Sequence, residues 1–331
     1  MDNNKKDKEH GKIFISWNDS GRTRDLSDAL RVPAFVKQIG GQAWYRHTAS
    51  SFWTVWLLAI KRPRTILFQN SFLLALVLGM YRSIRGKSVV LIADCHTKSL
   101  KRALPGRLGY IFWRLKFWSL TRCQALIIAT PELLPEANKF GRQVLVFPDI
   151  VPDWAPESQA PVERNKFLVV GSFAEDEPIE EMISAFENLP ECSFAMTGTP
   201  SPKVNNRDLP PNVTLLGFVA DNEFKHRLAT AGGVIALTKD TDCFLRSVCE
   251  ALATSRPIVT SDTPALRQYL DDAAVFVNPN CESIAAGVAR ANNMLDELQS
   301  RSEKRRREIK QTQEQRLEEL RWLLATNQTT R

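Results

Sequence analysis

The sequence predicts an α/β protein with two domains, each built around a parallel sheet. Short apolar runs alternate with segments whose apolar residues recur at helical spacing, which is the pattern of strand–loop–helix units. The 331 residues, 44% of them hydrophobic, are enough to bury two cores of ordinary size. Four prolines between Pro148 and Pro161 mark a boundary. The predicted parts are a domain at 1–150, a linker at 151–163, a domain at 164–300 and a helix at 301–331.

In the first domain, apolar runs that end at polar loops predict strands at 12–16, 42–46, 66–68, 88–93, 125–129 and 144–147. Helical spacing of apolar residues, and a proline that suits a helix start, predict helices at 26–39, 52–60, 72–82, 98–122 and from Pro131 onward. The apolar runs at 52–60 and 66–80 are shorter than the ~20 residues that cross a bilayer, so we expect them in the core.

Two loops of the first domain follow strands and carry candidate ligand-binding residues. After 12–16, Gly21 would let the backbone approach a ligand and Arg22 would meet a phosphate, although an ordinary polar turn explains this loop equally well. After 88–93, Asp94 and His96 leave the strand on the same side, where a carboxylate and an imidazole would bind or deprotonate a hydroxyl. The alternative is a polar pair that is satisfied at a strand end.

Charge is divided unevenly between the two halves of the chain. Residues 1–158 carry 24 Lys and Arg against 12 Asp and Glu, whereas 159–331 carry 20 against 25. A basic first half predicts contact with anionic lipid, a phosphate-bearing ligand or nucleic acid, unless the charge only keeps a tryptophan-rich half soluble. Aromatic and basic side chains are interleaved at 107–122, which favours a helix at a membrane interface over an internal helix.

Cysteine use and the start of the chain indicate a reducing compartment. The six cysteines form no C-x-x-C pair, and several lie in apolar runs, where a reduced thiol packs as a small apolar group. The polar stretch at 1–12 lacks the apolar core of a signal peptide. We expect a cytoplasmic protein that is peripheral on the inner face of the membrane.

In the second domain, the same patterns predict strands at 166–171, 192–196, 213–216, 234–237 and 257–259, and helices at 179–186, 221–231, 245–252, from Asp262 onward and at 282–324. Ligands of open parallel sheets bind beyond the carboxyl ends of the strands. The polar residues at these ends are Gly171 and Ser172, then Thr197, Gly198 and Thr199, then the loop that contains Lys239, Asp242 and Phe244.

Glu250 lies near the start of the helix that follows this last loop, and it is the central candidate. Helical side chains lean toward the N-terminus, so its carboxylate would reach a ligand across the loop, and a bidentate acceptor suits the two hydroxyls of a ribose. The alternative is an ion pair with Arg246 on a solvated helix face. Asp240 and Asp242 form a D-x-D pair, but it lies late in a second βα array, so we predict no metal.

The stretch EALATSRPIVTSD, from Glu250 to Asp262, resembles the donor-site signature of the family 4 (group 1) glycosyltransferases, E-x7-E followed by an alanine and then P-[IV]-[IV]-x-[ST]. Asp242 replaces the first glutamate. The resemblance implies the GT-B fold, two facing Rossmann-like domains with a cleft between them. It also implies a nucleotide-diphosphate-sugar donor, with Glu250 on the ribose, Asp242 and the following loop on the sugar, and Thr197 to Thr199 on the nucleotide.

The turn at Gly171 departs from this family. The usual sequence there is G-R-L-x-x-x-K-G, whose Arg and Lys neutralise the donor diphosphate, and here Ser172 and Glu177 stand at those positions. One interpretation is a variant site in which N–H groups of a helix start, or Lys239, Arg246 or an arginine of the first domain, stabilise the diphosphate. The other is a degenerate site in a protein that has lost catalysis.

The segment Asp94-Cys95-His96 is similar to the D-x-H segment of the lipid-linked-oligosaccharide β-1,4-mannosyltransferases, which implies that Asp94 and His96 activate an acceptor hydroxyl. We expect a hexosyltransferase that uses no metal or other cofactor and acts on a lipid-linked or saccharide acceptor in surface polysaccharide or glycolipid assembly. A non-catalytic glycosyltransferase-like binding subunit is the alternative. Basic residues at 301–310 are interleaved with glutamates, so we expect a solvated helix face there and no nucleic-acid partner.

Overall fold

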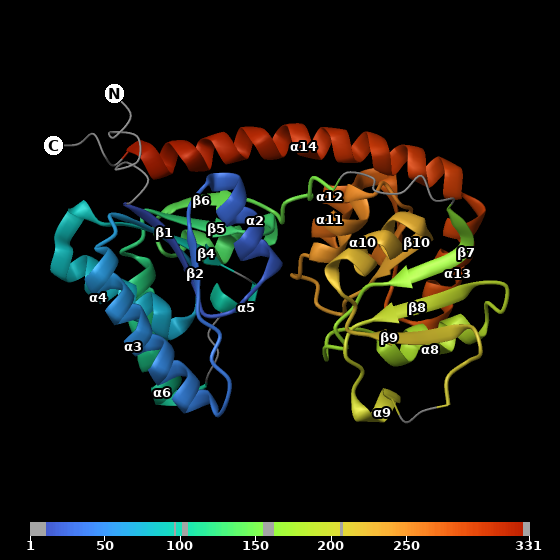
Figure 1. Cartoon of the computed structure of the whole chain (residues 1–331), viewed down its shortest axis with the longest axis horizontal. Helices are drawn as coiled ribbons and strands as arrows, with labels where there is room; N and C mark the ends of the chain where they lie inside the picture. Colours follow the sequence, from blue (N-terminus) through green and yellow to red (C-terminus); the bar gives the residue numbers. More distant parts are fainter. Residues whose placement is uncertain (1–10, 96, 101–104, 155–161, 206–207, 327–331) are drawn as a thin grey trace. The chain divides into compact units, whose positions relative to one another are not determined.

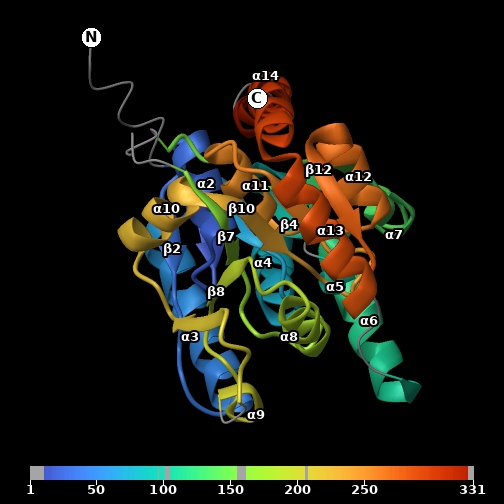
Figure 2. The ribbon, with the colours of Figure 1, turned by 90° about the vertical axis from the view of Figure 1, so that its right-hand side faces the viewer.

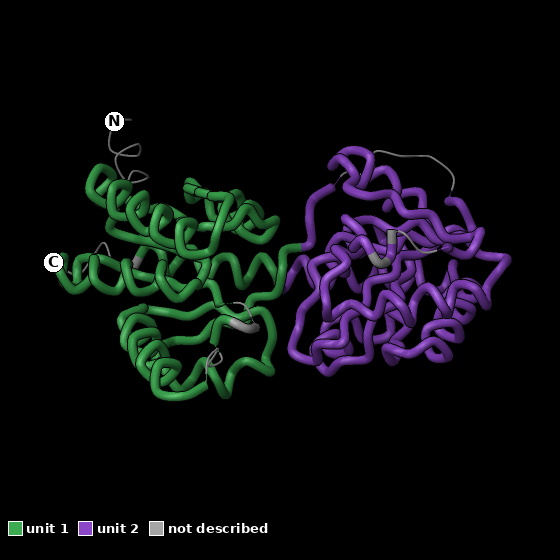
Figure 3. Tube along the Cα trace, turned by 90° about the horizontal axis from the view of Figure 1, so that it is seen from below, with its two compact units in different colours: residues 1–150, 313–331 green, residues 151–312 purple. Residues whose placement is uncertain are grey.

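The computed structural model of the chain consists of two α/β units (Figure 3). Unit 1 contains residues 1–150 and 313–331, and unit 2 contains residues 151–312. Each unit holds one six-stranded sheet whose paired strands are all parallel. The residues that the structure describes are 11–95, 97–100, 105–154, 162–205 and 208–326. The predicted α/β fold class with two Rossmann-like domains is therefore confirmed.

The sheet of unit 1, coloured from blue to green in Figure 1, has the strand order β2-β1-β3-β4-β5-β6. Its strands are β1 (Lys12–Ser16), β2 (Ala34–Val36), β3 (Thr65–Gln69), β4 (Val90–Cys95), β5 (Ala125–Ile128) and β6 (Gln143–Val146). Its described helices are α2 (Gly21–Leu30), α3 (Ala43–Lys61), α4 (Phe72–Arg85), α5 (Thr97–Leu100), α6 (Gly106–Leu120) and α7 (Leu134–Asn138), with 3₁₀ helices at Gly86–Ser88 and Pro131–Leu133. Because the strands are parallel, their carboxyl ends meet at one edge of the sheet.

Helices cover both faces of the unit 1 sheet, since alternate residues of each strand point to opposite sides. Ile13 of β1 joins a buried cluster with α3, α4 and α6, whereas Phe14 joins a second cluster with α2 and the end of α14 (Leu295–Thr326). Helix α4 packs against both α3 and α6. At Gly79 of α4 the approach is so close that a Cβ atom would lie 3.0 Å from the Trp118 ring.

Two elements predicted near the start of the chain are wrong. The helix predicted at 26–39 ends at Leu30, and residues 34–36 form strand β2 instead. Pro33 explains the difference, because proline has no N–H to donate and disfavours helical backbone at the residue before it. The strand predicted at 42–46 falls in the first turn of α3.

The buried side of α3 is partly polar, which hides its helical period in the sequence. Ser50, Thr54 and Leu57 are buried at helical spacing. The Thr54 hydroxyl donates to the Ser50 carbonyl at 2.8 Å and accepts from Trp17 Nε1 at 3.0 Å, so its polar atom is satisfied inside the core. The apolar pattern becomes clear only further along, where the predicted helix at 52–60 begins.

Unit 2 has the strand order β12-β11-β10-β7-β8-β9. Its strands are β7 (Glu163–Val169), β8 (Ser193–Thr197), β9 (Val213–Gly217), β10 (Ala231–Ala236), β11 (Ile258–Ser261) and β12 (Ala274–Val277). Its described helices are α8 (Ile179–Glu187), α9 (Pro202–Asn205), α10 (Asp221–Thr230), α11 (Arg246–Ala253), α12 (Pro264–Leu270), α13 (Cys281–Asn293) and the first part of α14, with a 3₁₀ helix at Asp271–Ala273.

The unit 2 sheet also has a helical layer on each face. Phe167 of β7 joins a cluster with α8 and α13, which lie side by side (Figure 2), whereas Leu168 joins a cluster with α10, α11 and α12. Helix α13 packs closely on β12, since a Cβ atom at Gly287 would lie 2.2 Å from Val277 Cγ1. The tract predicted as one helix at 282–324 is two helices, α13 and α14.

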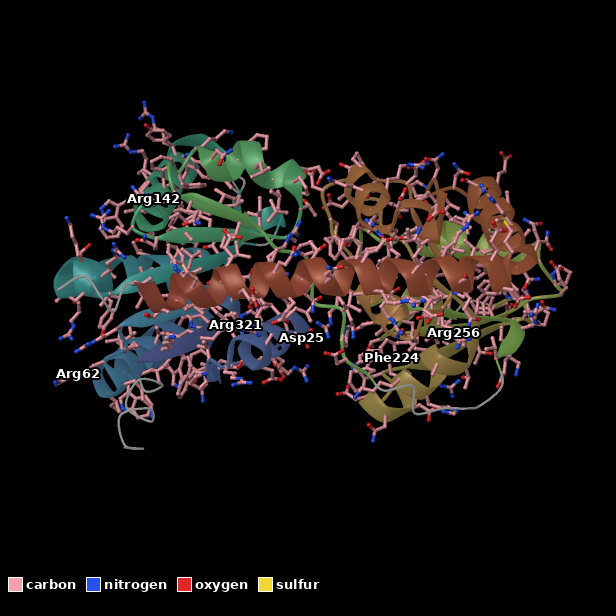
Figure 4. All side chains as sticks on the ribbon, turned by 90° about the horizontal axis from the view of Figure 1, so that it is seen from above. Asp25, Arg62, Arg142, Phe224, Arg256 and Arg321 are labelled. Atoms are coloured by element: carbon pink, nitrogen blue, oxygen red, sulfur yellow. The ribbon has the colours of Figure 1, made fainter. Side chains whose placement is uncertain are left out.

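Helix α14 contributes to both units, because its residues up to 312 belong to unit 2 and those from 313 belong to unit 1. In unit 1, four leucines of α14 are buried with α2, and Arg321 donates to the Ala29 carbonyl at 3.0 Å (Figure 4). In unit 2, Arg305 donates to the Tyr269 carbonyl at 2.7 Å and Arg306 to the Ala253 carbonyl at 2.8 Å. The basic cluster at 301–310 is therefore not only a solvated face, since two of its arginines bind the carbonyl ends of α12 and α11.

Candidate functional site

The chain turns directly after β7, at Gly171, Ser172 and Phe173. The Glu177 carboxylate accepts hydrogen bonds from the N–H groups of Ser172 and Phe173, both at 2.9 Å, and from the Ser172 hydroxyl at 2.8 Å. A Cβ atom at Gly171 would lie 2.6 Å from Glu177 Oε2, so a larger residue there would displace the end of the Glu177 side chain. Successive N–H groups that converge in a turn make an anion-binding concavity. In this chain the Glu177 carboxylate occupies that concavity.

The end of the neighbouring strand β8 contacts this turn through hydrogen bonds and a close backbone approach. Gly198 has a φ of 104°, and a Cβ atom there would lie 2.5 Å from the Gly171 carbonyl oxygen. The Thr197 hydroxyl donates to the Val169 carbonyl at 3.2 Å and accepts from the Gly171 N–H at 3.4 Å. The close approach of this backbone to Gly171, together with the positive φ, explains the glycine at 198. Thr199, the next residue, is exposed.

The loop after β10 joins the same edge of the sheet. The Thr238 hydroxyl donates to the Asp176 carboxylate at 2.9 Å, and the Lys239 N–H donates to the Asp176 carbonyl at 2.6 Å. Lys239 Nζ lies 2.9 Å from Glu181 Oε1. Burial raises the pKa of Glu181, but the hydrogen bond and charge of Lys239 outweigh it and leave that pKa below its usual value. We call Gly171, Ser172, Glu177, Thr197, Gly198, Thr238 and Lys239 the carboxyl-edge cluster.

Asp242 and Phe244 lie further along the β10 loop. The Asp242 N–H donates to Asp240 Oδ1 at 3.1 Å, so one member of the D-x-D pair caps the loop backbone. The Phe244 ring meets the Tyr269 ring edge to face, with centroids 4.8 Å apart. These contacts fix the loop that leads into α11.

Glu250 lies in the second turn of α11, and its side chain is 14% exposed. Arg246 Nε donates to Glu250 Oε1 at 3.0 Å. The ion pair left open by the sequence is therefore present, but the carboxylate is not on a solvated helix face. This ion pair is therefore largely shielded from solvent.

The candidate residues of unit 1 form a buried ion cluster that the sequence does not reveal. Arg22 donates bidentately to Asp94, with Nε at 3.0 Å and Nη2 at 2.8 Å from Oδ1, and its Nη1 donates to Asp149 at 2.9 Å. Arg22 is 5% exposed and Asp94 is 1% exposed. Burial lowers the pKa of Arg22, but the two carboxylates raise it above its ordinary value. Arg22 and Asp94 are thus held together inside unit 1.

The other candidates of unit 1 lie around this cluster in the chain. Gly21 is the first residue of α2, whose N-terminus is capped by the Ser20 hydroxyl, which accepts from the Thr23 N–H at 3.2 Å. His96 lies outside the described residues. Asp94 is the fifth residue of β4, so its carboxylate comes from the carboxyl end of that strand.

A cavity of about 360 Å³ in unit 2 lies elsewhere on the sheet. Its lining comes from the amino-terminal part of β7, the start of β10 and helix α10, and includes Lys166, Glu223 and Arg227. The carboxyl-edge cluster sits at the opposite ends of these strands. We base the site on the cluster, because ligands of parallel sheets bind where the strands end.

Comparison with known families decides the class of unit 2. Residues 151–315 match the family model described as glycosyl transferases group 1. The chain carries a group 1 glycosyltransferase domain. This glycosyltransferase domain includes every donor-site candidate named above. No curated protein matches the chain.

Solved structures that resemble the chain cover both units. Sucrose-phosphate synthase of Thermosynechococcus elongatus matches with a TM-score of 0.71 at 15% identity, over 96% of this chain and 98% of that chain. The Anabaena protein HepE in complex with UDP matches with a TM-score of 0.67 at 13% identity, over 93% and 91%. The UDP-forming α,α-trehalose-phosphate synthase of Burkholderia xenovorans matches with a TM-score of 0.66 at 15% identity, over 89% and 96%. These matches show that the glycosyltransferase has the GT-B fold.

Two further predictions concern metal and membrane. Within the described ranges, the glycosyltransferase has no group of three or more His, Cys, Asp or Glu placed to hold a metal ion, and the absence of a metal in the reaction stays a prediction. Among the residues that the structure describes, no helix is both long enough and apolar enough to span a bilayer. The likeness to β-1,4-mannosyltransferases rests on the sequence segments alone.

Proposed function

We propose that this glycosyltransferase moves a hexosyl group from a nucleotide-diphosphate sugar to a lipid-linked or saccharide acceptor, close to a membrane, in surface polysaccharide or glycolipid assembly. The observation that carries the donor half is Glu250, a carboxylate that is 14% exposed and follows the β10 loop inside the matched family domain. Similar solved proteins carry UDP-glucose or glucose-6-phosphate, which supports a nucleotide-sugar donor and a saccharide acceptor.

Each donor-site residue then has a proposed role. Glu250 accepts hydrogen bonds from the two ribose hydroxyls, which a bidentate carboxylate can take together. Thr197, Gly198 and Thr199 hold the base and its ribose, since Gly198 brings the backbone close without a side chain. The remaining donor residues contact the diphosphate and the sugar: Gly171, Ser172, Lys239, Asp242 and Phe244.

The proposed acceptor half is in unit 1. His96 takes the proton from the acceptor hydroxyl, and Asp94 orients it. Asp94 is not the base in this proposal, because its buried carboxylate already accepts hydrogen bonds from the Arg22 guanidinium. Arg22 holds Asp94 in place through its guanidinium, and Gly21 precedes it as the first residue of α2.

The leaving diphosphate develops negative charge, and cations or N–H donors must stabilise it. Lys239 is the lysine in the carboxyl-edge cluster, and it would turn from Glu181 to the diphosphate. Glu177 is unfavourable for diphosphate binding, because its carboxylate already accepts the hydrogen bonds of the N–H groups in the turn. That observation favours a second candidate function, a non-catalytic subunit that binds a nucleotide or a partner enzyme without turnover.

A thermal-shift series with UDP, GDP and ADP tests the donor site. A nucleoside diphosphate at about 100 times its Kd stabilises the native state by about 2.7 kcal/mol, so the melting temperature of the wild-type protein should rise by several degrees. Glu250→Ala should abolish this rise. The control is Glu223→Ala, because Glu223 forms the same i,i+4 pair with Arg227 on α10, at 2.7 Å. Equal rises in both variants would contradict the role of Glu250.

Turnover separates the two candidate functions. The enzyme should release the nucleoside diphosphate from one sugar nucleotide in a panel, and an acceptor should speed that release. Release should fall by at least about 100-fold in His96→Ala, since general base catalysis contributes about 10²–10⁴-fold. Nucleotide binding without release from any donor, with or without saccharide and lipid-linked acceptors, would favour the non-catalytic subunit.

A further inference from the structure

Exposed apolar side chains gather on three helices of unit 1, α3, α4 and α6, and we call their outer surface the α3–α4–α6 face. Among the described residues, 13 of the 15 large apolar side chains that are exposed lie on these helices. Phe52 and Trp56 of α3 are 77% and 59% exposed, Ile84 of α4 is 84% exposed, and Leu108 of α6 is 70% exposed. Single exposed apolar residues are normal in soluble proteins, but a concentration of this kind marks an interaction surface.

The exposed residues form stripes rather than a scatter. On α3, Phe52, Trp56 and Ile60 recur every four residues, on the side opposite the buried Ser50, Thr54 and Leu57. On α6, four of the five exposed apolar residues, Leu108, Ile111, Phe112 and Leu115, share one helix face. A helix that is apolar on both its buried and its outer side needs a second apolar environment.

The three helices form one layer. Helix α4 packs against α3 and α6, and the three lie together in Figure 1. The rings of Phe72 at the start of α4 and Phe112 of α6 meet edge to face, with centroids 5.2 Å apart. At the other end, Arg122 after α6 donates to the Ser83 hydroxyl of α4 at 2.9 Å. The stripes therefore belong to one connected surface.

The positive charge of this layer indicates that its partner is anionic. Residues 29–131 contain 16 Lys and Arg but a single carboxylate, Asp94, which is buried against Arg22. Arg62 at the end of α3 is exposed (Figure 4), and Arg114 and Lys116 lie over the Tyr110 and Trp113 rings of α6. Cations on flexible stems beside the exposed Tyr110 ring and the partly buried Trp113 ring match the headgroup region of an anionic bilayer. A second copy of the chain would bring the same positive charge against itself.

We propose that the α3–α4–α6 face binds the surface of a bilayer that contains anionic phospholipid. The apolar stripes enter the boundary between headgroups and acyl chains, and the surrounding Lys and Arg side chains contact lipid phosphates. The sequence predicts such contact only at 107–122, and the structure adds α3 and α4 to it. The inference deepens the proposed function by naming the lipid surface, but it concerns unit 1 and does not depend on the donor site.

Vesicle flotation tests this face without any nucleotide sugar, so its outcome is independent of transfer activity. The full-length protein should float with phosphatidylcholine vesicles that contain about 30% phosphatidylglycerol, and binding should weaken on pure phosphatidylcholine and at high salt, because surface charge is screened within a Debye length. The double variant Phe52→Ser with Trp56→Ser should lower the apparent partition coefficient by at least about tenfold, since two aromatic groups no longer enter the interface.

The chain offers a matched control for this variant. Phe218, 86% exposed, and Trp322, 62% exposed, are the same residue types on surfaces outside the three helices. Phe218→Ser with Trp322→Ser should bind vesicles as the wild type does, and circular dichroism should show both double variants folded. Wild-type protein that stays with the soluble fraction would overturn the proposal. Equal loss of vesicle binding in both double variants would also overturn it. So would a dimer that sedimentation detects without lipid and that dissociates only in the Phe52→Ser, Trp56→Ser variant.

Discussion

Arg22 lies at the centre of a buried ion cluster in unit 1. Its guanidinium joins Asp94 and Asp149, which lie 72 and 127 positions away in the chain. Arginine suits this place because its planar fork serves two carboxylates at once and stays charged when buried. The cluster ties the start of α2 to the end of β4 and to the segment after β6.

Removing this guanidinium should be costly. Arg22→Ala leaves two buried carboxylates without their cation, and breaking a buried ion pair destabilises by about 3–5 kcal/mol. Urea unfolding should show that loss. Arg24→Ala is the control, because Arg24 forms an exposed pair with Asp19 at 3.3 Å and should change stability by less than about 0.5 kcal/mol. Equal losses in the two variants would show that the cluster is not the source of stability.

Glu177 gives a prediction about affinity. Its carboxylate occupies N–H groups that an incoming diphosphate would otherwise use, and it repels that diphosphate. Glu177→Gln should therefore tighten the binding of the preferred nucleoside diphosphate by about tenfold, as measured by titration calorimetry. Glu175→Gln removes the same charge from an exposed position in the same loop and should leave the Kd nearly unchanged. Weaker binding of the Glu177 variant would mean that the carboxylate only holds the turn.

The cysteines provide a test of burial and pH. Cys243 and Cys281 are partly exposed and the other four are buried, so a thiol reagent should titrate two groups in the native protein near pH 8 and six in denaturant. Burial raises the pKa of Cys123 to about 12. Because this folded-state pKa is above the value of about 9 in the unfolded chain, its contribution to stability is complete below pH 9 and is lost as the pH rises toward 12. Cys123→Ala should flatten that part of the stability curve, and an unchanged curve would contradict the assignment.

At the residue scale, the sequence predicted which positions carry unusual residues better than it predicted the hydrogen bonds and ion pairs that these residues form. The departures at Ser172 and Glu177 are visible in the sequence, but their mutual hydrogen bonds depend on the left-handed φ of 60° at Phe173. The Arg22 cluster is not predictable from spacing, because its members meet only when the start of α2, the end of β4 and the segment after β6 are assembled. Glu250 and Arg246 are neighbours on one helix, so their pairing was predictable, whereas their burial was not.

Among the elements, α13 and β12 have the tightest described contact at a glycine. Gly287→Ala would gain up to about 1 kcal/mol of helix propensity, but its methyl group would have to displace Val277, which is stiff and buried. We expect a net loss of about 1–2 kcal/mol in thermal unfolding, since overpacking costs about 1–3 kcal/mol. Gly40→Ala meets open space and should be neutral. A stabilised Gly287→Ala variant would show that Val277 can move without cost.

Elements were predictable where apolar residues alone carry the period. Strands β4 and β10 are continuous buried runs and were found as such. Helix α3 was predicted only over 52–60, because Ser50 and Thr54 occupy its buried side while tryptophan and phenylalanine occupy its outer side. An apolar pattern reports contact with something apolar, and for α3 that contact is only partly with the protein's own core.

For the molecule as a whole, α14 makes the stability of unit 1 depend on the last part of the chain. Leu320 and Leu324 are 1% and 3% exposed in the unit 1 core. Leu320→Ala and Leu324→Ala should each cost about 2–5 kcal/mol, and tryptophan fluorescence reports mainly on this unit, since seven of the eight tryptophans lie in it. Trp322→Ala, on the exposed side of the same turn, is the control and should change stability little. Losses confined to unit 2 would refute this dependence.

The order of synthesis adds a consequence. A ribosome releases the N-terminal sheet first, yet that sheet lacks four leucines of its core until residues 313–326 have emerged. All residues of the intervening unit 2, 151–312, have been synthesised by then. The nascent chain therefore completes its second half before its first, and the earliest segment made is the longest exposed to chaperones.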